Sequence, residues 1–266
     1  KKSFCDQSPM SRVSDLLGVL LTVHFAPEDV SLVLRFPAER RRALDILISQ
    51  ASTAYLTDLQ QYNKVLAHRN RALRLVGRES RDGNDVEAWN GQFCKFGGRI
   101  RQQRLEALSQ LSTPYRLAYG RFSPASEVAD IRYDGPLPDG VCQVDFLRQQ
   151  LAEKRVAERR QGHTVCGPHR DDLVFTLNGE AAHEFASEGQ LKTVLIAWKM
   201  AEFEFLANAR GKKPVLLLDD LFSELDEERV ERLLDYMDAF EQVLLTTPNQ
   251  LDRSIRGRFS EIRLAS

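Results

Sequence analysis

Cysteine and long apolar runs are both scarce in this chain of 266 residues. Its four cysteines are scattered and include no Cys-x-x-Cys pair, which fits reduced thiols in a cytoplasm. No apolar stretch approaches the ~20 residues that a membrane-spanning helix needs. The mean hydropathy of −0.37 and the charged fraction of 28% are ordinary for a soluble protein. We therefore expect a cytoplasmic protein with no membrane contact.

The formal net charge of −1 hides an uneven distribution of charged residues. Residues 35–116 hold 15 Lys/Arg against 8 Asp/Glu, whereas residues 117–266 hold 19 against 26. A basic segment beside an acidic one suggests two lobes with different partners.

Residues 215–220, Val-Leu-Leu-Leu-Asp-Asp, form an apolar run that ends in two carboxylates. The run predicts a strand that is buried on both faces. Two ionised carboxylates repel each other unless a cation lies beside them, and at the end of a parallel strand the usual cation is Mg²⁺ on a nucleotide phosphate. Asp219 would hold the ion or its waters, and Asp220 would orient an attacking water. A strand that enters an acidic helix N-cap is the alternative interpretation.

The residues that follow predict a β-α-β unit. Asp226 is expected to cap a helix with Glu227 and Glu228 in its first turn. Residues 242–247, Gln-Val-Leu-Leu-Thr-Thr, predict a second buried strand that ends in hydroxyl groups. The polar side chains of this unit, Thr246 included, then gather at one sheet edge.

Ser187-Glu-Gly-Gln190 opens a predicted helix that extends to about Asn208. Ser187 is the expected N-cap, and Gly189 allows a backbone to approach closely. A helix N-terminus with free N–H groups, a hydroxyl and a glycine suits a phosphate. The pattern is weak by itself and gains weight from its place upstream of residues 215–220.

The order of these motifs resembles the signature motif, Walker B, D-loop and switch region of an ABC-type ATPase head. Three further segments narrow the resemblance to the bacterial RecF family: Gly167-Pro-His-Arg-Asp-Asp172, Phe25-Ala-Pro-Glu-Asp29 and Arg40-Arg-Arg-Ala-Leu-Asp45. The resemblance extends from about Leu16 to Thr247. RecF proteins are ATP-dependent DNA-binding dimers that act with RecR and RecO at single-strand gaps and help to place RecA.

The resemblance implies ATP and Mg²⁺ as cofactors. Asp220 is then the expected catalytic residue, and Asp219 the expected ligand of Mg²⁺, directly or through water. The expected nucleotide-binding residues are Ser187, Gly189, Gln190, Asp226 and Thr246. Two heads would face each other, with Ser187 of one reaching the γ-phosphate held by the other. The implied partners are a second copy of the chain, DNA at gaps or single-strand/double-strand junctions, RecR and RecO. The implied location is the nucleoid.

The chain departs from the family pattern because it contains no Gly-x-x-x-x-Gly-Lys-[Ser/Thr]. We expect it to be a C-terminal part of a longer protein, without the first strand, the P-loop and its helix. A natural, degenerate homologue is the alternative. The longer protein would be a slow DNA-dependent ATPase, and this chain alone would be inactive. No Gln lies between Thr22 and Leu34 to serve as the family's Q-loop residue, and Asp29 is expected to be a helix N-cap.

The expected fold is α/β: an incomplete ABC-type ATPase lobe with a mostly parallel sheet and an inserted helical lobe. Residues 1–34 would end the first ATPase segment, 35–116 would form the helical lobe, and 117–266 would form the rest of the ATPase lobe. Pro114, Pro124, Pro136 and Pro138 mark the predicted return to that lobe. Residues 144–161 predict an amphipathic helix, and residues 173–179 predict a strand that enters a hairpin turn. Arg170 would meet a phosphate or pair with Asp171 or Asp172.

Residues 35–116 predict a helical hairpin. Two apolar stripes with helical spacing flank a turn at residues 77–84, and Arg69 interrupts the first stripe. Their aromatic residues lie at packing positions and are interpreted as core. The candidates for DNA phosphate contact are Arg71, Arg74, Arg78, Arg81, Arg99, Arg101 and Arg104. A solvated helix surface is the alternative.

Two other functions remain open from the sequence. A structural chromosome protein of the SMC class shares the head motifs but needs a longer coiled coil. A helical DNA- or protein-binding module without catalysis needs no P-loop. The presence of a P-loop upstream distinguishes the ATPase from the module.

Overall fold

The computed structural model describes residues 3–5, 8–10, 16–34, 36–79, 84–123, 126–136, 138, 140–220, 226–237, 240–247, 257 and 260. The helices are η2 (Pro27–Asp29), α1 (Val30–Leu34), α2 (Pro37–Ala51), α3 (Thr53–Glu79), α4 (Asn84–Phe122), α5 (Gln143–Gln161), α6 (Ala182–Phe185), α7 (Glu188–Arg210) and α8 (Glu227–Met237). The strands are β1 (Ser3–Cys5), β2 (Ser8–Met10), β3 (Thr22–Phe25), β4 (Ala129–Asp134), β5 (Asp172–Leu177), β6 (Glu180–Ala181), β7 (Val215–Asp219) and β8 (Val243–Thr246).

A parallel sheet in the order β3-β7-β8 forms one side of the body. Its inward residues, among them Val23, Leu216 and Leu218, are buried with α7, whose central Trp198 is fully enclosed. The predicted β-α-β unit and the α/β fold with a parallel sheet are confirmed. The prediction that residues 215–220 are buried on both faces is only partly met, because Leu216 and Leu218 are buried whereas Val215 and Leu217 are half-buried. The prediction that β8 is a buried strand is wrong, since Leu244 is 52% exposed.

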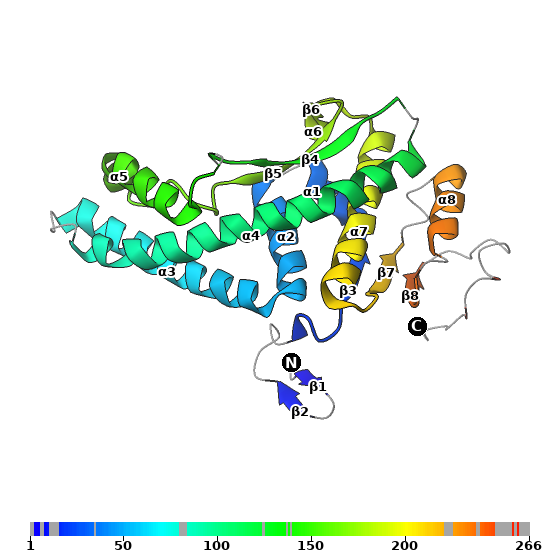
Figure 1. Ribbon diagram of the computed structural model, residues 1–266, viewed down its shortest axis with the longest axis horizontal. Helices are drawn as coiled ribbons and strands as arrows, with labels where there is room; N and C mark the ends of the chain where they lie inside the picture. Colours follow the sequence, from blue (N-terminus) through cyan, green and yellow to red (C-terminus); the bar gives the residue numbers. More distant parts are fainter. Residues whose placement is uncertain are drawn as a thin grey trace.

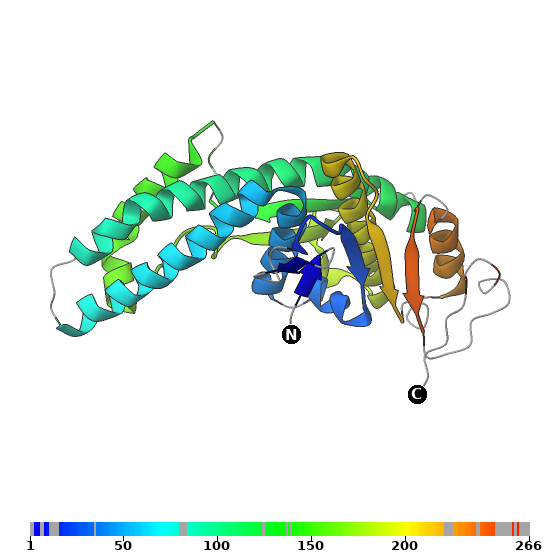
Figure 2. The same ribbon diagram turned by 90° about the horizontal axis from the view of Figure 1, so that it is seen from below.

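The helices α3 and α4 form an antiparallel hairpin that extends away from the body as an arm (Figures 1 and 2). The predicted apolar stripes face each other, and the rings of Tyr62 and Phe93 lie 5.3 Å apart between centroids. The helical hairpin and its aromatic core are therefore confirmed. The turn residues 80–83, with Arg81, lie outside the described part of the chain, as does the side chain of Arg78.

One helix, α4, connects the arm to the body. It continues through Pro114 to Phe122 and packs against α7. Pro114 thus lies inside a helix and does not end it. Proline leaves the carbonyl four residues earlier without a helical donor, and here that residue, Gln110, is exposed to water. The division at residues 116 and 117 falls within α4 and stays a prediction.

A second sheet, β4-β5-β6, is antiparallel and covers the other side of α4. The strand β4 was not expected from the sequence. The predicted turn after β5 is confirmed, since Asn178 and Gly179 adopt φ angles of 51° and 89°, as a tight hairpin requires. Within the described ranges, no helix combines the length and the apolar character needed to cross a bilayer.

Candidate nucleotide-binding site

The carboxyl ends of β7 and β8 bring two predicted site residues together. Asp219 pairs with Thr246 in the parallel register, and the Thr246 hydroxyl donates a hydrogen bond to the Asp219 carboxylate. Both side chains are exposed at the sheet edge. The sequence predicted this meeting, because parallel strands end at the same edge.

Asp220 leaves the strand in a left-handed conformation, with φ of 44°, which is uncommon for a residue other than glycine. Its amide donates to the Thr246 carbonyl at 3.0 Å, so the turn is fixed to the neighbouring strand. Carboxylate and hydroxyl oxygens are the ligands that Mg²⁺ prefers, and protein sites for this ion usually supply one or two carboxylates beside water and phosphate. The carboxylates of Asp219 and Asp220 and the Thr246 hydroxyl at this sheet edge fit that pattern.

Ser187 caps α7, as predicted. Its hydroxyl oxygen accepts from the Gln190 amide at 3.3 Å, and the Gln190 side chain accepts from the Ser187 amide at 2.8 Å. This reciprocal pair is a capping box. Ser187 and Glu188 are exposed, so the first turn of α7 faces solvent. The Ser187 hydroxyl keeps its proton available for an anion that approaches from outside.

Glu127 holds the start of α7 to the end of α4, and no local pattern in the sequence indicates this role. The Gln190 amide nitrogen donates to Glu127 at 2.7 Å, and the hydroxyls of Ser123 and Tyr119 donate to the same carboxylate. Those hydrogen bonds, first from Ser123 and then from Tyr119, hold the pKa of Glu127 below its usual value. Both polar groups of the Gln190 side chain are thus engaged within the protein.

Arg229, on α8, is a second residue that sequence reasoning missed. Its guanidinium donates to the Gly189 carbonyl at 3.3 Å and to the Thr193 hydroxyl at 3.2 Å, and it pairs with Asp226. Asp226 accepts from the Arg229 amide at 2.9 Å, which confirms the predicted cap. That backbone hydrogen bond is the main cause of the lowered pKa of Asp226. The spacing of an aspartate cap and an arginine three residues later was the available signal.

Glycine at position 189 makes room for this arginine. A Cβ built on Gly189 would lie 3.2 Å from an Arg229 guanidinium nitrogen. The close approach that the sequence predicted at Gly189 is therefore made, within this chain, by a side chain of α8. Residues 223–225 of the predicted D-loop lie outside the described residues.

At the end of β3, Asp29 is not the expected N-cap. The cap of η2 is Ala26, and the Asp29 carboxylate reaches back to accept from the Ala26 amide at 3.0 Å. Asp29 also lies 3.4 Å from the amine of Lys199 on α7, which is 3.5 Å from Glu202. Pro27 at the first helical position explains the shift, because proline starts a helix and leaves the capping residue before it.

The segment Gly167–Asp172 ties α2 and α4 together. Arg101 binds both oxygens of Asp171 at 2.7 and 2.8 Å, and Arg40 binds both oxygens of Asp172 at 3.0 and 2.6 Å. Arg170 donates to the Thr164 carbonyl at 3.2 Å. The expected pairing of Arg170 with its neighbouring carboxylates is therefore wrong, because arginines from α2 and α4 occupy them.

Two predicted DNA contacts, Arg101 and Arg104, are wrong. They are 0% and 3% exposed, and Arg104 binds Asp45 and the Pro168 carbonyl. They lie on the face of α4 that packs inward, where a guanidinium must be paired to be tolerated. Arg71, Arg74 and Arg99 are exposed, and Arg99 lies 3.5 Å from Asp58.

The basic segment, residues 35–116, and the acidic segment, residues 117–266, are joined by ion pairs. Four arginines of residues 35–116 pair with carboxylates of residues 117–266, and one pair runs in the opposite direction. They are Arg40–Asp172, Arg69–Glu158, Arg101–Asp171 and Arg116–Asp130, and in reverse Glu87–Arg155. Three of these pairs are largely buried. Part of the basic excess is therefore paired with carboxylates of residues 117–266 and is not available to a partner.

No family model matches the chain. It is 37% identical over 254 residues to the DNA replication and repair protein RecF of Halothermothrix orenii, covering 92% of this chain and 68% of that protein. It is 34% identical over 260 residues to the protein of the same name from Chlorobium phaeobacteroides, covering 96% and 71%. Two solved structures of the recombination mediator protein RecF in the RecFOR pathway, with ATPrS and with ATP, share its fold at a TM-score of 0.82 with 30% and 29% identity. They cover 92% of this chain, and it spans 67% and 66% of theirs. The chain belongs to the RecF family of DNA replication and repair proteins.

Proposed function

We propose that this chain supplies the Walker B, signature and D-loop elements of an ATP site in a protein that binds DNA as an ATP-dependent dimer. The observation that carries the proposal is the pairing of Asp219 with Thr246 at the carboxyl edge of a parallel sheet. The solved relative with bound ATP supports a nucleotide at this fold. The phosphate-cradling loop itself is not among the 266 residues.

In this proposal Asp219 and Thr246 would hold Mg²⁺, directly or through water. The ion would supply positive charge against the β- and γ-phosphates. Asp220 would accept a hydrogen bond from the attacking water. This contact would orient a lone pair of the water oxygen toward the γ-phosphate. Its position is set by the amide contact to the Thr246 carbonyl.

Ser187 would act on the nucleotide of a second copy. It is held through Gln190 and Glu127 to the end of α4, whereas Asp219 is held through Thr246 to β8. Two separate networks position the two halves, and the outward-facing start of α7 suits an anion presented by another molecule. Arg229 links this helix start to Asp226, so both predicted interface motifs would move as one unit.

For the biological role we propose DNA binding at gaps or single-strand/double-strand junctions, with RecR and RecO as partners in helping to place RecA. The family name and the RecFOR pathway of the solved relatives support this assignment. The SMC-class alternative predicts a much longer coiled coil than the arm formed by α3 and α4.

The experiment uses a version of the protein that carries the P-loop. Its affinity for gapped duplex DNA is measured by fluorescence anisotropy with and without ATP and Mg²⁺. We expect ATP to tighten binding, and Asp219→Asn to abolish that gain while the matched surface variant Asp134→Asn retains it. A DNA affinity that does not respond to ATP would contradict the proposed function.

A further inference from the structure

We propose that α5, together with the end of α3, forms a DNA phosphate-contact surface on the arm. This inference rests on the proposed DNA-binding function and adds the location of the surface. The sequence assigned α5 to the ATPase lobe, and none of its residues was among the predicted DNA contacts. In the structure, α5 lies along the arm formed by α3 and α4 (Figures 1 and 2).

Close packing fixes α5 on the arm. Leu147 and Leu151 are buried against it. A Cβ built on Gly98 would lie 2.7 Å from the backbone nitrogen of Val144, and one built on Gly97 would lie 2.7 Å from Leu147. Only glycine allows α4 and the start of α5 to approach so closely. The charged residues of α5 are therefore carried on a rigid support.

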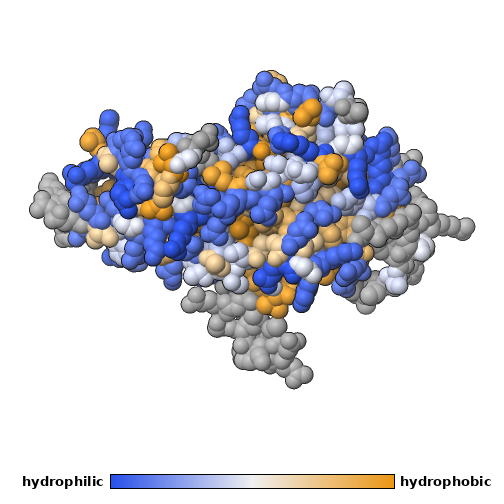
Figure 3. All heavy atoms as spheres, in the orientation of Figure 1, coloured by the Kyte–Doolittle hydropathy of each residue, from blue (hydrophilic) through white to orange (hydrophobic). Residues whose placement is uncertain are grey.

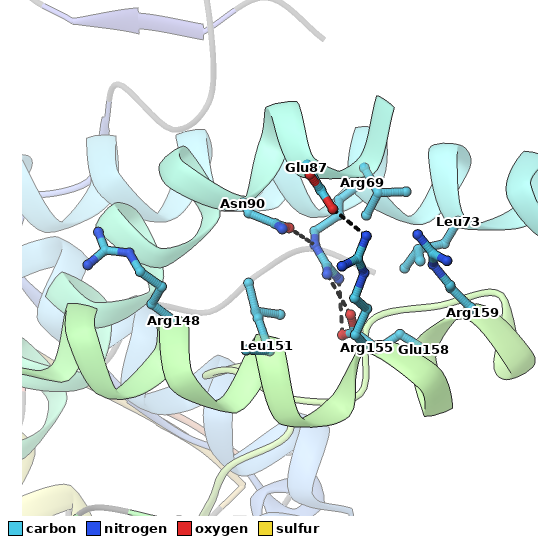
Figure 4. A pocket seen from close by; sticks show the side chains of 11 residues that line it. Arg69, Leu73, Glu87, Asn90, Arg148, Leu151, Arg155, Glu158 and Arg159 are labelled. Atoms are coloured by element: carbon cyan, nitrogen blue, oxygen red, sulfur yellow. Dashed lines mark hydrogen bonds and ion pairs between the residues drawn. The ribbon is translucent and has the colours of Figure 1, made fainter. Parts of the chain in front are cut away.

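A pocket of about 360 Å³ lies between α5 and the hairpin (Figure 4). Its apolar part is formed by Leu73, Val86 and Leu151. Arg148, Arg155 and Arg159 line its α5 side. Steps of seven and four residues place these arginines ~10 Å and ~6 Å apart along the helix axis. A row of cations of this length matches several successive phosphates better than a single carboxylate.

The buried charge beneath this row does not cancel it. Glu158 accepts both hydrogen bonds of a bidentate pair with Arg69, and each side chain is 2% exposed. Arg69 is further held by Asn90 and Thr164. Glu158 is therefore neutralised inside the arm, and the arginines of α5 keep their charge for the surface.

The carboxylates that do touch the row are exposed. Arg155 pairs with Glu87 at 2.5 Å, with the two side chains 57% and 50% exposed, and Arg148 pairs with Asp145 at 2.6 Å. Pairs in water contribute ~0–1 kcal/mol, so a phosphate can replace either carboxylate at little cost. Arg159 makes no ion pair with a described residue.

Further cations extend the surface around the end of α5. Lys154 and Arg160 are exposed on its outer side. Arg74 of α3 lies beside Gly162, where a Cβ would be 3.7 Å from the Arg74 side chain. Figure 3 shows hydrophilic residues over this end of the molecule with hydrophobic ones between them, and Val156 of α5 is 79% exposed. Exposed cations from two helices thus meet at one place, which is the electrostatic footprint of a nucleic-acid contact.

The test compares two triple variants of the P-loop-carrying protein, with ATP present. Arg155→Ala, Arg159→Ala and Arg160→Ala together remove the proposed contacts. Arg116→Ala, Arg121→Ala and Arg132→Ala together remove exposed arginines of α4 and β4 outside this surface. Fluorescence anisotropy gives the DNA affinity at several salt concentrations. We expect the first variant to flatten the log–log salt slope by roughly two to three, equally for different DNA sequences, and the second to change it by less than about one.

Several results would overturn the inference. The inference is wrong if the first variant keeps the full salt slope. It is also wrong if this variant loses binding to polyglutamate but keeps binding to DNA, because the surface would then serve an acidic protein partner. Circular dichroism and the urea midpoint establish that the variant is folded. An unchanged protein that binds no DNA at any salt concentration would instead overturn the proposed function, and this surface with it.

Discussion

The Arg229 guanidinium donates to the Gly189 carbonyl at 3.3 Å, and the same group pairs with Asp226. These contacts join the first turn of α7 to the first turn of α8. In the proposed dimer both turns would face the second copy. A single side chain then sets the spacing of two elements that the sequence presents as separate motifs.

Replacing this arginine should loosen the start of α7. We expect Arg229→Ala to lower the free energy of unfolding by ~1–2 kcal/mol, because it removes the hydrogen bond to the Thr193 hydroxyl and the ion pair with Asp226. Hydrogen exchange at residues 190–194 should quicken. Arg229→Lys should recover part of the loss, since it keeps the charge but not the three donors. Arg232→Ala, on the same helix, is the control, and equal exchange in both alanine variants would contradict the coupling.

The buried pair of Arg69 and Glu158 predicts a large, asymmetric effect. Arg69→Ala should cost ~3–5 kcal/mol in urea unfolding, because it leaves a carboxylate buried without its partner. The double variant Arg69→Met with Glu158→Leu should recover much of that loss. Arg116→Ala, which breaks an exposed pair with Asp130, should cost less than about 1 kcal/mol. A similar small loss for Arg69→Ala would mean that water reaches Glu158 in the folded arm.

His169 predicts a dependence of stability on pH. Burial lowers its pKa from 6.5 to about 4, and its Nδ1 lies 2.6 Å from the Tyr62 hydroxyl. Between pH 6.5 and 4 the unfolded chain binds more protons than the folded one, so stability falls as the pH falls through this window. The loss amounts to at most about 3 kcal/mol. Above pH 6.5 this contribution is constant.

The variant His169→Asn keeps an acceptor near Tyr62 but does not titrate. Urea unfolding from pH 7 to pH 4 should show a shallower loss of stability for this variant than for the unchanged chain. His183→Asn, at an exposed position, should reproduce the unchanged profile. Parallel profiles for all three proteins would show that His169 titrates normally in the folded state.

Local patterns were sufficient for much of the fold. The helix caps at Ser187 and Asp226 and the turn at Asn178 depend on residues within a few positions of each other, and each is confirmed. The parallel β-α-β unit and the helical hairpin followed from the periodicity of consecutive elements, and both are confirmed. The meeting of Asp219 with Thr246 followed from strand direction alone. Sequence reasoning succeeded for most predictions that a single helix or strand decides, and the N-cap expected at Asp29 is an exception.

Contacts between side chains far apart in the sequence could not be predicted from local patterns. Arg101 and Arg104 lie in the same stretch of sequence as the exposed Arg99. Only the packing of α4, which buries one face of the helix, distinguishes the two buried arginines from the exposed one. Glu127 and Gln190 are 63 residues apart, and no spacing rule joins them. The charge asymmetry was interpreted as two lobes with different partners, whereas several arginines of the basic segment form buried ion pairs with carboxylates of the acidic segment.

The 266-residue chain by itself should not hydrolyse ATP. It contains no Gly-x-x-x-x-Gly-Lys-[Ser/Thr] motif, and the backbone N–H groups and lysine of that loop supply the phosphate cradle. Phosphate release from purified chain should equal that of an Asp220→Asn control prepared in parallel. A rate above the control would show that Asp219, Asp220 and Ser187 hold a nucleotide without the loop.

The proposed contact between Ser187 and the nucleotide of a second copy is tested most directly by light scattering with ATP, on the P-loop-carrying protein. Asp220→Asn should still dimerise, because it removes the carboxylate that orients water and leaves the phosphate contacts intact. Ser187→Arg should remain a monomer although it binds ATP, since the larger side chain cannot fit against the opposite phosphate. Ser109→Arg, at an exposed position on α4, should dimerise normally. A Ser187→Arg protein that dimerises like the unchanged protein would contradict the account.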